Sequence, residues 1–220
     1  MMTKPNGHVC EICHHATHRW QHPKTKTTFY VCPHCEHIRR DPTNDPSCEE
    51  EKTIYDFHKN TLENKGYVRF LNDFATRSLI PYVNEGHVLD LGSGPNPVFA
   101  HLLKEVHHYN VSIYDPIYAD DDTVFQRSYD AVTMSETIEH IHHIDLLFNM
   151  LNDVLREGSV LAVMTLFRPK TKEDFFKWWY IRDETHVRFF NRRTFEEIAT
   201  IHGYDILDCD GKRKITLRKR

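Results

Sequence analysis

Four of the six cysteines stand at the spacing of metal ligands. They form two Cys-x-x-Cys pairs separated by eighteen residues, namely Cys10, Cys13, Cys32 and Cys35. Each pair places two thiolates on one side of a metal, and the second pair completes a tetrahedron. We therefore expect a structural Zn²⁺ that folds residues 1–40 as a small zinc ribbon. Cys48 and Cys209 lack a partner at ligand spacing and are interpreted as ordinary thiols.

Two other chemistries of paired cysteines compete with zinc. Disulfides belong to oxidising compartments, but the start of the chain, Met1–Pro5, has no apolar signal-peptide core, so we expect a cytoplasmic protein. A redox Cys-x-x-Cys would be single and would adjoin a strand–helix–strand unit. No apolar run approaches the roughly 18 residues of a membrane-spanning helix, and no membrane partner is expected.

A second informative group is a glycine-rich turn. His87–Leu91 has the pattern of a buried strand and leads directly into Gly92-x-Gly94. The glycines let the backbone bend sharply and approach a ligand closely. Pro97 occupies the third glycine position of a dinucleotide-binding fingerprint, which weakens that interpretation, and no Gly-Lys-Ser/Thr of a phosphate-binding loop follows.

Two aspartates accompany this turn. Asp90 stands two residues before Gly92, where a carboxylate suits a cationic amino group better than a pyrophosphate. Asp115 ends the next expected strand and is placed to bind a ribose diol through two acceptor oxygens. The alternative is that each is only a turn aspartate.

A third group follows the expected strand Tyr129–Ser135. Glu136, Glu139 and His140 stand at positions i, i+3 and i+4, which share one face of a helix. Two carboxylates and one imidazole on that face would suit Mg²⁺ or Mn²⁺, or would act as acid and base. The alternative is that His140 only caps or packs.

The elements that must position these residues alternate between strand and helix patterns. Expected strands are His87–Leu91, Val111–Tyr114, Tyr129–Ser135 and Val160–Thr165, and expected helices are Val98–Val106 and Ile144–Leu155. Thr194-x-x-Glu197 predicts a capping box for a helix that ends at Gly203. Asp210-Gly211 predicts a hairpin. The fold class is therefore α/β, a Rossmann-like mainly parallel sheet with helices on both faces and a C-terminal antiparallel hairpin, preceded by the zinc ribbon.

Three regions are expected along the chain. Residues 1–40 form the ribbon, residues 41–85 a linker and helical lid, and residues 86–220 the core, with an insertion at 166–190. Tyr67, Phe70, Leu71 and Phe74 mark an amphipathic helix in the second region. His58 and Asn60 in the same region are candidates for contacts of a lid.

Charge is distributed unevenly around a net of −4. Residues 1–40 hold six Lys or Arg against Glu11 and Glu36, and residues 211–220 hold six with no acid. A uniformly basic nucleic-acid binder is excluded, but the two basic ends leave RNA open as a partner.

The second half of the chain resembles the class I S-adenosylmethionine-dependent methyltransferases. The resemblance runs from residue 86 to the C-terminus and rests on the Asp90-x-Gly92-x-Gly94 turn, Asp115, Tyr129-Asp130-Ala131-Val132 and Glu157-Gly158. It implies S-adenosylmethionine as cofactor, bound by Asp90, Gly92, Gly94 and Asp115, with the glycines at the methionine part and Asp115 at the ribose. Candidates for the adenine pocket are Asp122, Val124 and Phe125.

Within this family, the Glu136–His140 segment resembles the E-x-x-E-H element of metal-assisted O-methyltransferases such as the ubiquinone-pathway enzymes. The resemblance implies catalytic roles for Glu136, Glu139 and His140, with His143 or His186 completing a shell around Mg²⁺ or Mn²⁺. Other methyltransferases of this fold carry Glu-His here without a metal, so a metal-free role in catalysis or acceptor positioning stays open.

The acceptor would lie beside the insertion 166–190, whose arginines and aromatic residues suit a flat or anionic molecule or form a packed lid. The residues concerned are Arg168, Trp178, Trp179, Tyr180, Arg182, Asp183, His186 and Arg188. We expect methyl transfer to an unidentified small molecule, with a hydroxyl as one acceptor group. The alternatives are an RNA methyltransferase that uses the ribbon and the basic C-terminus, or a non-catalytic zinc-ribbon binding module.

Overall fold

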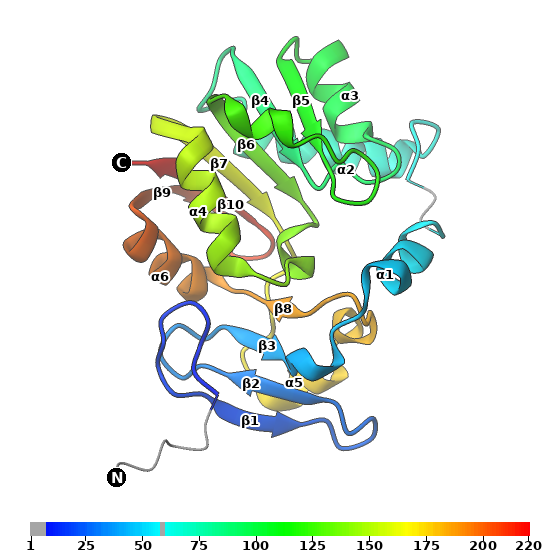
Figure 1. Ribbon diagram of the computed structural model, residues 1–220, viewed down its shortest axis with the longest axis vertical. Helices are drawn as coiled ribbons and strands as arrows, with labels where there is room; N and C mark the ends of the chain where they lie inside the picture. The colour runs from blue at the N-terminus through cyan, green and yellow to red at the C-terminus, as the bar shows by residue number, and fades with distance from the viewer. Residues whose placement is uncertain (1–7, 58–59) are drawn as a thin grey trace.

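The computed structural model describes residues 8–57 and 60–220, and it contains two β-sheets (Figure 1). The larger sheet has the strand order β5-β4-β6-β7-β10-β9. Its strands are β4 (His87–Leu91), β5 (Asn110–Tyr114), β6 (Tyr129–Ser135), β7 (Leu155–Met164), β9 (Tyr204–Cys209) and β10 (Lys214–Lys219). The first four pair in parallel, whereas β10 pairs antiparallel with both β7 and β9. The predicted mainly parallel sheet with a C-terminal hairpin is confirmed.

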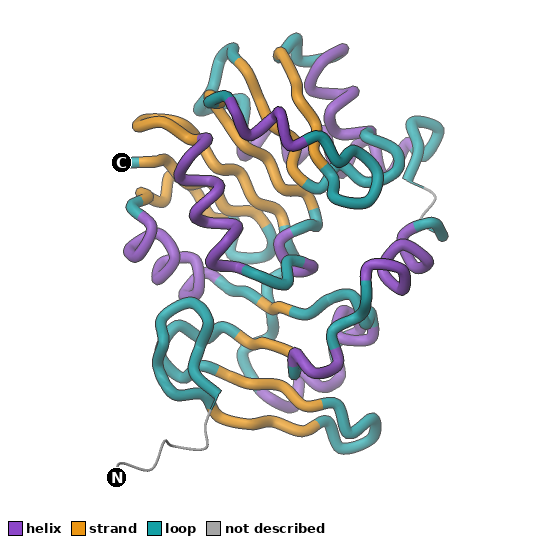
Figure 2. The backbone as a smooth tube through the Cα atoms, viewed as in Figure 1, coloured by secondary structure: helices purple, strands orange, loops and turns teal. Residues whose placement is uncertain are grey.

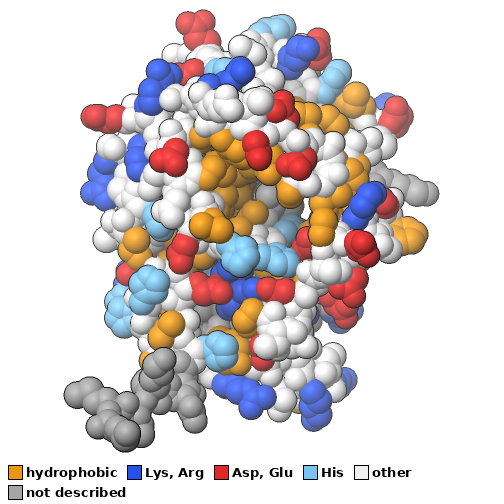
Figure 3. Space-filling view, viewed as in Figure 1, with side chains coloured by type: hydrophobic (Ala, Val, Ile, Leu, Met, Phe, Trp, Pro, Cys, Tyr) orange, Lys and Arg blue, Asp and Glu red, His pale blue; other side chains and the backbone are white. Residues whose placement is uncertain are grey.

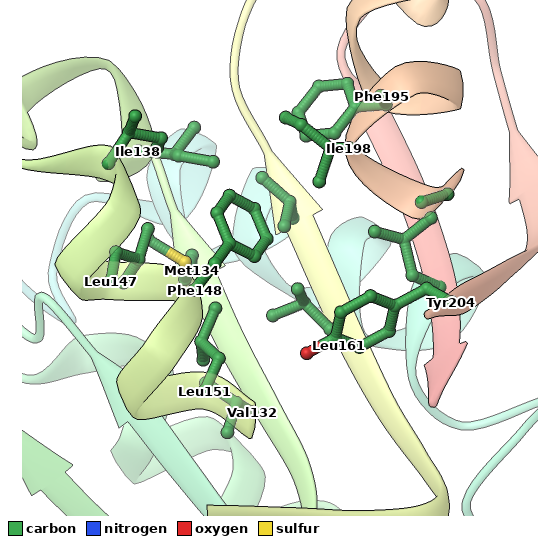
Figure 4. Close-up of a cluster of buried hydrophobic side chains, with 14 of the residues drawn as sticks. Val132, Met134, Ile138, Leu147, Phe148, Leu151, Leu161, Phe195, Ile198 and Tyr204 are labelled. Atoms are coloured by element: carbon green, nitrogen blue, oxygen red, sulfur yellow. The ribbon is translucent and has the colours of Figure 1, made fainter. Parts of the chain in front are cut away.

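Helices cover both faces of this sheet. Successive side chains of a strand point to opposite faces, so each buried strand presents apolar side chains on both faces. The helices are α2 (Lys65–Ser78), α3 (Val98–Glu105), α4 (Ile144–Val154) and α6 (Arg192–His202). On one face Val132 and Met134 of β6 pack with Phe148 of α4 and Ile198 of α6 (Figure 4). On the other face Ala131 packs in the cluster that contains α2 and α3.

Two local predictions need correction. The N-cap of α6 is Asn191, whose side chain accepts from the Thr194 backbone 3.0 Å away, so Thr194 is the third helical residue and not the cap. The expected strand Val160–Thr165 begins earlier, as β7 at Leu155, and it contains Glu157-Gly158; Gly158 has φ 82°, and the pairing with β6 shifts register there. Gly203 ends α6 in the left-handed conformation, as predicted.

The smaller sheet has the order β1-β2-β3-β8 and is antiparallel. Its strands are β1 (His18–Gln21), β2 (Thr28–Val31), β3 (Ile38–Arg40) and β8 (Arg188–Phe189). The fourth strand thus comes from the segment after β7, which also contributes α5 (Lys172–Lys177). Phe175 of α5 packs edge-on against Phe29 and Phe189 at 5.2 Å, so both parts of the chain share one core.

Further short helices connect the strands, and η3 among them lies between the two sheets, where it contacts β8 (Figure 2). They are η1 (Pro42–Asn44), α1 (Cys48–Tyr55), η2 (Asp122–Gln126), η3 (Ile138–His140) and η4 (Trp179–Arg182). A capping box between Ser47 and Glu50 starts α1. No helix in the described part of the chain is long and apolar enough to cross a membrane.

The basic C-terminal residues are not a tail. Lys214 is buried in β10, and its ammonium pairs with Asp73 of α2. Lys219 contacts Asn152 and donates to the His202 carbonyl 3.1 Å away. These two ammonium groups therefore bind side chains and backbone of the helices that pack on the sheet.

Candidate active site

A cavity of about 400 Å³ opens at the carboxyl ends of β4, β5 and β6, where the surface is hollowed between the two sheets (Figure 3). Its walls come from the glycine-rich turn after β4, from α1, from the segment after β6 and from η4. Ligands of open α/β sheets bind at this edge because parallel strands deliver their C-terminal loops there. The cavity is therefore the candidate active site.

The two glycines of the turn have different physical roles. Gly92 has φ 78°, and a Cβ at this position would lie 2.2 Å from Cγ2 of Thr137. Gly94 has φ 67°, and a Cβ there would meet no atom within 4 Å. Gly92 is thus required for packing of the turn, whereas Gly94 leaves open space at the cavity into which a ligand can approach the backbone.

Asp115 makes the contacts of a turn aspartate and also lines the cavity. Its Oδ2 accepts from the Gly94 backbone at 2.9 Å, and its Oδ1 accepts from Ile117 and Tyr118 at 2.9 and 3.1 Å. It therefore holds the glycine turn against the loop after β5. The same carboxylate lines the cavity and is 8% exposed.

Asp90 lies deeper, at the bottom of the cavity. Burial raises its pKa to about 7, and the Thr133 hydroxyl donates to Oδ1 at 3.1 Å. A buried carboxylate whose pKa burial has raised is stabilised in its charged form by a nearby positive charge. Asp90 can therefore supply the counter-charge for a cationic ligand.

The acid cluster after β6 forms, but not on the predicted helix. Glu136 has φ 53° and its backbone donates to the Met164 carbonyl at 2.7 Å, so the chain is still leaving the sheet at this residue. Only the short η3 follows, and the i, i+3, i+4 face does not exist. Instead the Tyr180 hydroxyl joins the two acids, with contacts to Glu139 and, at 3.3 Å, to Glu136 Oε2.

Burial changes the acidity of both glutamates. Glu139 is fully buried, and its burial together with the nearby Glu136 carboxylate raises its pKa to about 8. Burial also raises the pKa of Glu136, against the effect of Arg213. The second oxygen of Glu139 makes no hydrogen bond of standard geometry with the described residues. The pair therefore favours a shared proton or a bound cation.

Two histidines complete the cluster with a defined tautomer. Nδ1 of His140 lies 3.0 Å from the Thr185 carbonyl, and Nδ1 of His186 lies 2.8 Å from the Tyr180 carbonyl. Because a carbonyl only accepts, each neutral ring carries its proton on Nδ1 and its lone pair on Nε2. Ligand atoms of Glu139, His140 and His186 all lie within 4.8 Å of one another, a spacing that could hold a metal ion. His143 is exposed before α4 and does not join them.

The four cysteines at ligand spacing come together near the N-terminus. Sγ atoms of Cys10 and Cys35 lie 3.5 Å apart, those of Cys13 and Cys32 3.4 Å apart, and all four fall within 4.8 Å of one another. These separations exceed the roughly 2.05 Å of a disulfide bond. Four free thiols at this spacing suit tetrahedral Zn²⁺.

Several side chains at the cavity were not singled out from the sequence. Glu51 and Tyr55 reach it from α1. Of the two lid candidates that the sequence did indicate, Asn60 lines the cavity, whereas His58 lies outside the described residues. The only local signal for Glu51 and Tyr55 is the capped helix on which they stand. The adenine candidates Asp122, Val124 and Phe125 do not line the cavity, and the loop after β5 contributes Pro116 and Ile117 instead.

The arginines of the insertion are placed differently from the expectation of an anionic acceptor. Arg168 and Arg188 are buried against Glu36 and Glu11 of the N-terminal part. Neither they nor Arg182 line the cavity. Arg168 and Arg188 instead join the two parts of the chain, and of this region Trp179, Tyr180, Asp183 and His186 line the cavity.

The fold and the site define the class of the protein. A parallel sheet with this strand order, a glycine-rich turn after β4 and an aspartate after β5 are the features of S-adenosylmethionine-dependent methyltransferases noted above. The model of the methyltransferase-domain family matches residues 62–208. The chain belongs to this family.

The solved structure of one methyltransferase agrees with the fold. The mitomycin 7-O-methyltransferase MmcR is similar over 73% of this chain, with a TM-score of 0.54 and 10% identity, and the chain spans 56% of that enzyme's length. A putative methyltransferase from Bacillus halodurans C-125 is similar over 68% of this chain and 98% of its own, with a TM-score of 0.47 and 12% identity. No curated protein sequence matches the chain significantly.

Proposed function

We propose that the protein transfers a methyl group from S-adenosylmethionine to a hydroxyl group of a small molecule. One observation carries the proposal: a single cavity is lined by Gly94 and Asp115 at the strand ends and by Glu136, His140 and His186 on its other side. A methyl donor and its acceptor must meet in line in one water-poor space, and this arrangement supports such a meeting.

The side of the cavity at the strand ends, which carries Gly94 and Asp115, offers a binding partner for each part of the cofactor. The open space at Gly94 admits the methionine part close to the backbone. Asp115 has two oxygens for the ribose hydroxyls, and the buried charge of Asp90 would offset the cationic amino group. These roles follow the resemblance residue by residue.

The other side of the cavity, which carries Glu136, His140 and His186, favours a neutral, flat acceptor. Tyr55, Trp179 and Tyr180 supply aromatic surface. Among the described residues that line the cavity there is no lysine or arginine, while Glu51 and Asp183 add negative charge. A phosphate-bearing acceptor such as RNA would be repelled here, so we favour the small molecule over the RNA alternative.

The acid and histidine cluster would manage the proton of the hydroxyl. As the acceptor oxygen bonds to the methyl carbon, the sulfur–carbon bond breaks and the hydroxyl proton must leave. Nε2 of His140 or His186 would accept this proton, because both residues line the cavity, whereas Glu139 is fully buried and does not. The same three side chains would hold Mg²⁺ or Mn²⁺, which would lower the pKa of the hydroxyl.

The cysteine cluster would hold a structural Zn²⁺ that takes no part in this chemistry. Free thiols at ligand spacing suit a reducing compartment, and we therefore place the protein in the cytoplasm.

The test is a screen with S-adenosylmethionine carrying a labelled methyl group, over separate pools of small phenols, small amines and RNA. We expect label in the phenol pool, and we expect His140→Gln to lower the rate about 100-fold or more. His143→Gln is the matched control, since this exposed histidine does not line the cavity. Label confined to RNA or amines, or equal loss in both variants, would contradict the proposal.

A further inference from the structure

Each cysteine pair of the N-terminal part presents one glutamate to one buried arginine from the segment between β7 and α6. Glu11, between Cys10 and Cys13, pairs with Arg188 and also lies 3.5 Å from Nε of the buried Arg39. Glu36, directly after Cys35, pairs with Arg168 at 3.1 Å. The two pairs are chemically alike, but their other contacts differ, and this difference suggests what the first pair does.

Arg188 fastens the loop that carries the acid cluster. Its side chain is 1% exposed. Beyond Glu11, its Nε donates to the Ile141 carbonyl at 2.5 Å and its Nη2 donates to the His142 carbonyl at 2.7 Å. These two residues directly follow His140, so one guanidinium connects the cysteine pair to the end of η3.

The residues before Arg188 hold the same loop at two more points. The Val187 backbone donates to the Glu139 carbonyl at 3.0 Å, and Nδ1 of His140 donates to the Thr185 carbonyl at 3.0 Å. The position of Glu139 and His140 therefore depends on how segment 185–188 is held.

Arg168 makes no such connection. Its Nε donates to the Glu36 carbonyl at 2.7 Å and its Nη1 donates to its neighbour Pro169 at 2.8 Å. It ties the second cysteine pair to the chain after β7 without contacting the loop after β6. Glu36 and Arg168 thus form a control of matched chemistry.

We infer that Glu11 and Arg188 are positioning residues. They connect the cysteine cluster to the acid and histidine cluster (Glu136, Glu139, His140 and His186) and thereby hold the second cluster in place. The fork of a buried guanidinium fixes two carbonyls and a carboxylate in one geometry, which neither a lysine nor an amide can reproduce. The inference rests on the proposed function only where it concerns catalysis; the anchoring itself is a property of the fold.

The test compares Glu11→Gln and Arg188→Lys with Glu36→Gln and Arg168→Lys. Amide hydrogen exchange of residues 138–142 reports the anchoring without any acceptor. We expect exchange there to rise about tenfold or more in the first two variants only. With an acceptor, kcat should fall about tenfold or more while Kd for S-adenosylmethionine stays within twofold.

Equal exchange at 138–142 in the Glu11 and Glu36 variants would overturn the inference, as would a fall in kcat shared by all four variants. Glu11 is one-third exposed, so Glu11→Gln decides the question if Arg188→Lys fails to fold. Absence of any methyl transfer by the unchanged protein would count against the proposed function alone, because the exchange comparison would still stand.

Discussion

At the scale of the residue, burial determines what the glutamates beside Tyr180 can do. Glu139 has no access to water; the Tyr180 hydroxyl contacts it, and the Glu136 carboxylate lies close enough to raise its pKa. The sequence indicated that Glu136, Glu139 and His140 act together, and the structure does bring them to one site. It indicated Tyr180 only as an acceptor-side residue and not as the bridge between the acids, because Tyr180 lies more than forty residues further along the chain.

The raised pKa of Glu139 makes stability depend on pH. Its pKa is about 8 in the folded protein and 4.5 as the ordinary value, so the folded state binds this proton more tightly than the unfolded chain. The stabilisation is complete below pH 4.5 and is lost as pH rises through about 8. We predict that the free energy of unfolding falls over this window, and that it falls less in Glu139→Gln.

Urea denaturation at about pH 5 and about pH 8.5 measures this difference. Glu173→Gln, at an exposed position in the first turn of α5, is the control and should keep the dependence of the unchanged protein. The same fall in all three proteins would show that Glu139 is not the titrating group.

At the scale of the element, the turn after β4 shows what sequence patterns can and cannot predict. The pattern predicted β4, the turn and α3 nearly to the residue, because buried parallel strands are continuous apolar runs and glycines interrupt them. It did not distinguish the two glycines, since Thr137, which contacts Gly92, comes from the loop after β6.

This distinction gives a prediction for the turn. Gly92→Ala and Gly94→Ala both place alanine at positive φ, which costs about 1 kcal/mol or more. Only Gly92→Ala also forces a Cβ against Thr137, which adds about 1–3 kcal/mol. Denaturant titration should therefore rank Gly92→Ala as the less stable variant; equal stability would mean that the contact with Thr137 relaxes freely.

At the scale of the whole molecule, the two sheets act as one structure. The strand β8 pairs with β3, and Cys10, Cys32 and Cys35 belong to the same buried cluster as α4 and α6. The sequence separated a ribbon at 1–40 from an insertion at 166–190, because pairing between strands about 150 residues apart leaves no local pattern. The fold class was predictable from local periodicity, but this long-range junction was not.

The cavity between the sheets carries the central claim, and cofactor binding tests it most directly. Calorimetry with S-adenosylmethionine should compare the unchanged protein, Asp115→Ala and Asp121→Ala. Asp121 is a matched control, because it also accepts from a backbone amide as the cap of η2, but it does not line the cavity.

We predict that the unchanged protein and Asp121→Ala bind alike. Asp115→Ala should bind more weakly by about 1.5–3 kcal/mol, the scale of a lost hydrogen bond to a charged group. Equal affinity in all three proteins, or no binding by the unchanged protein, would contradict the assignment of this cavity to the cofactor.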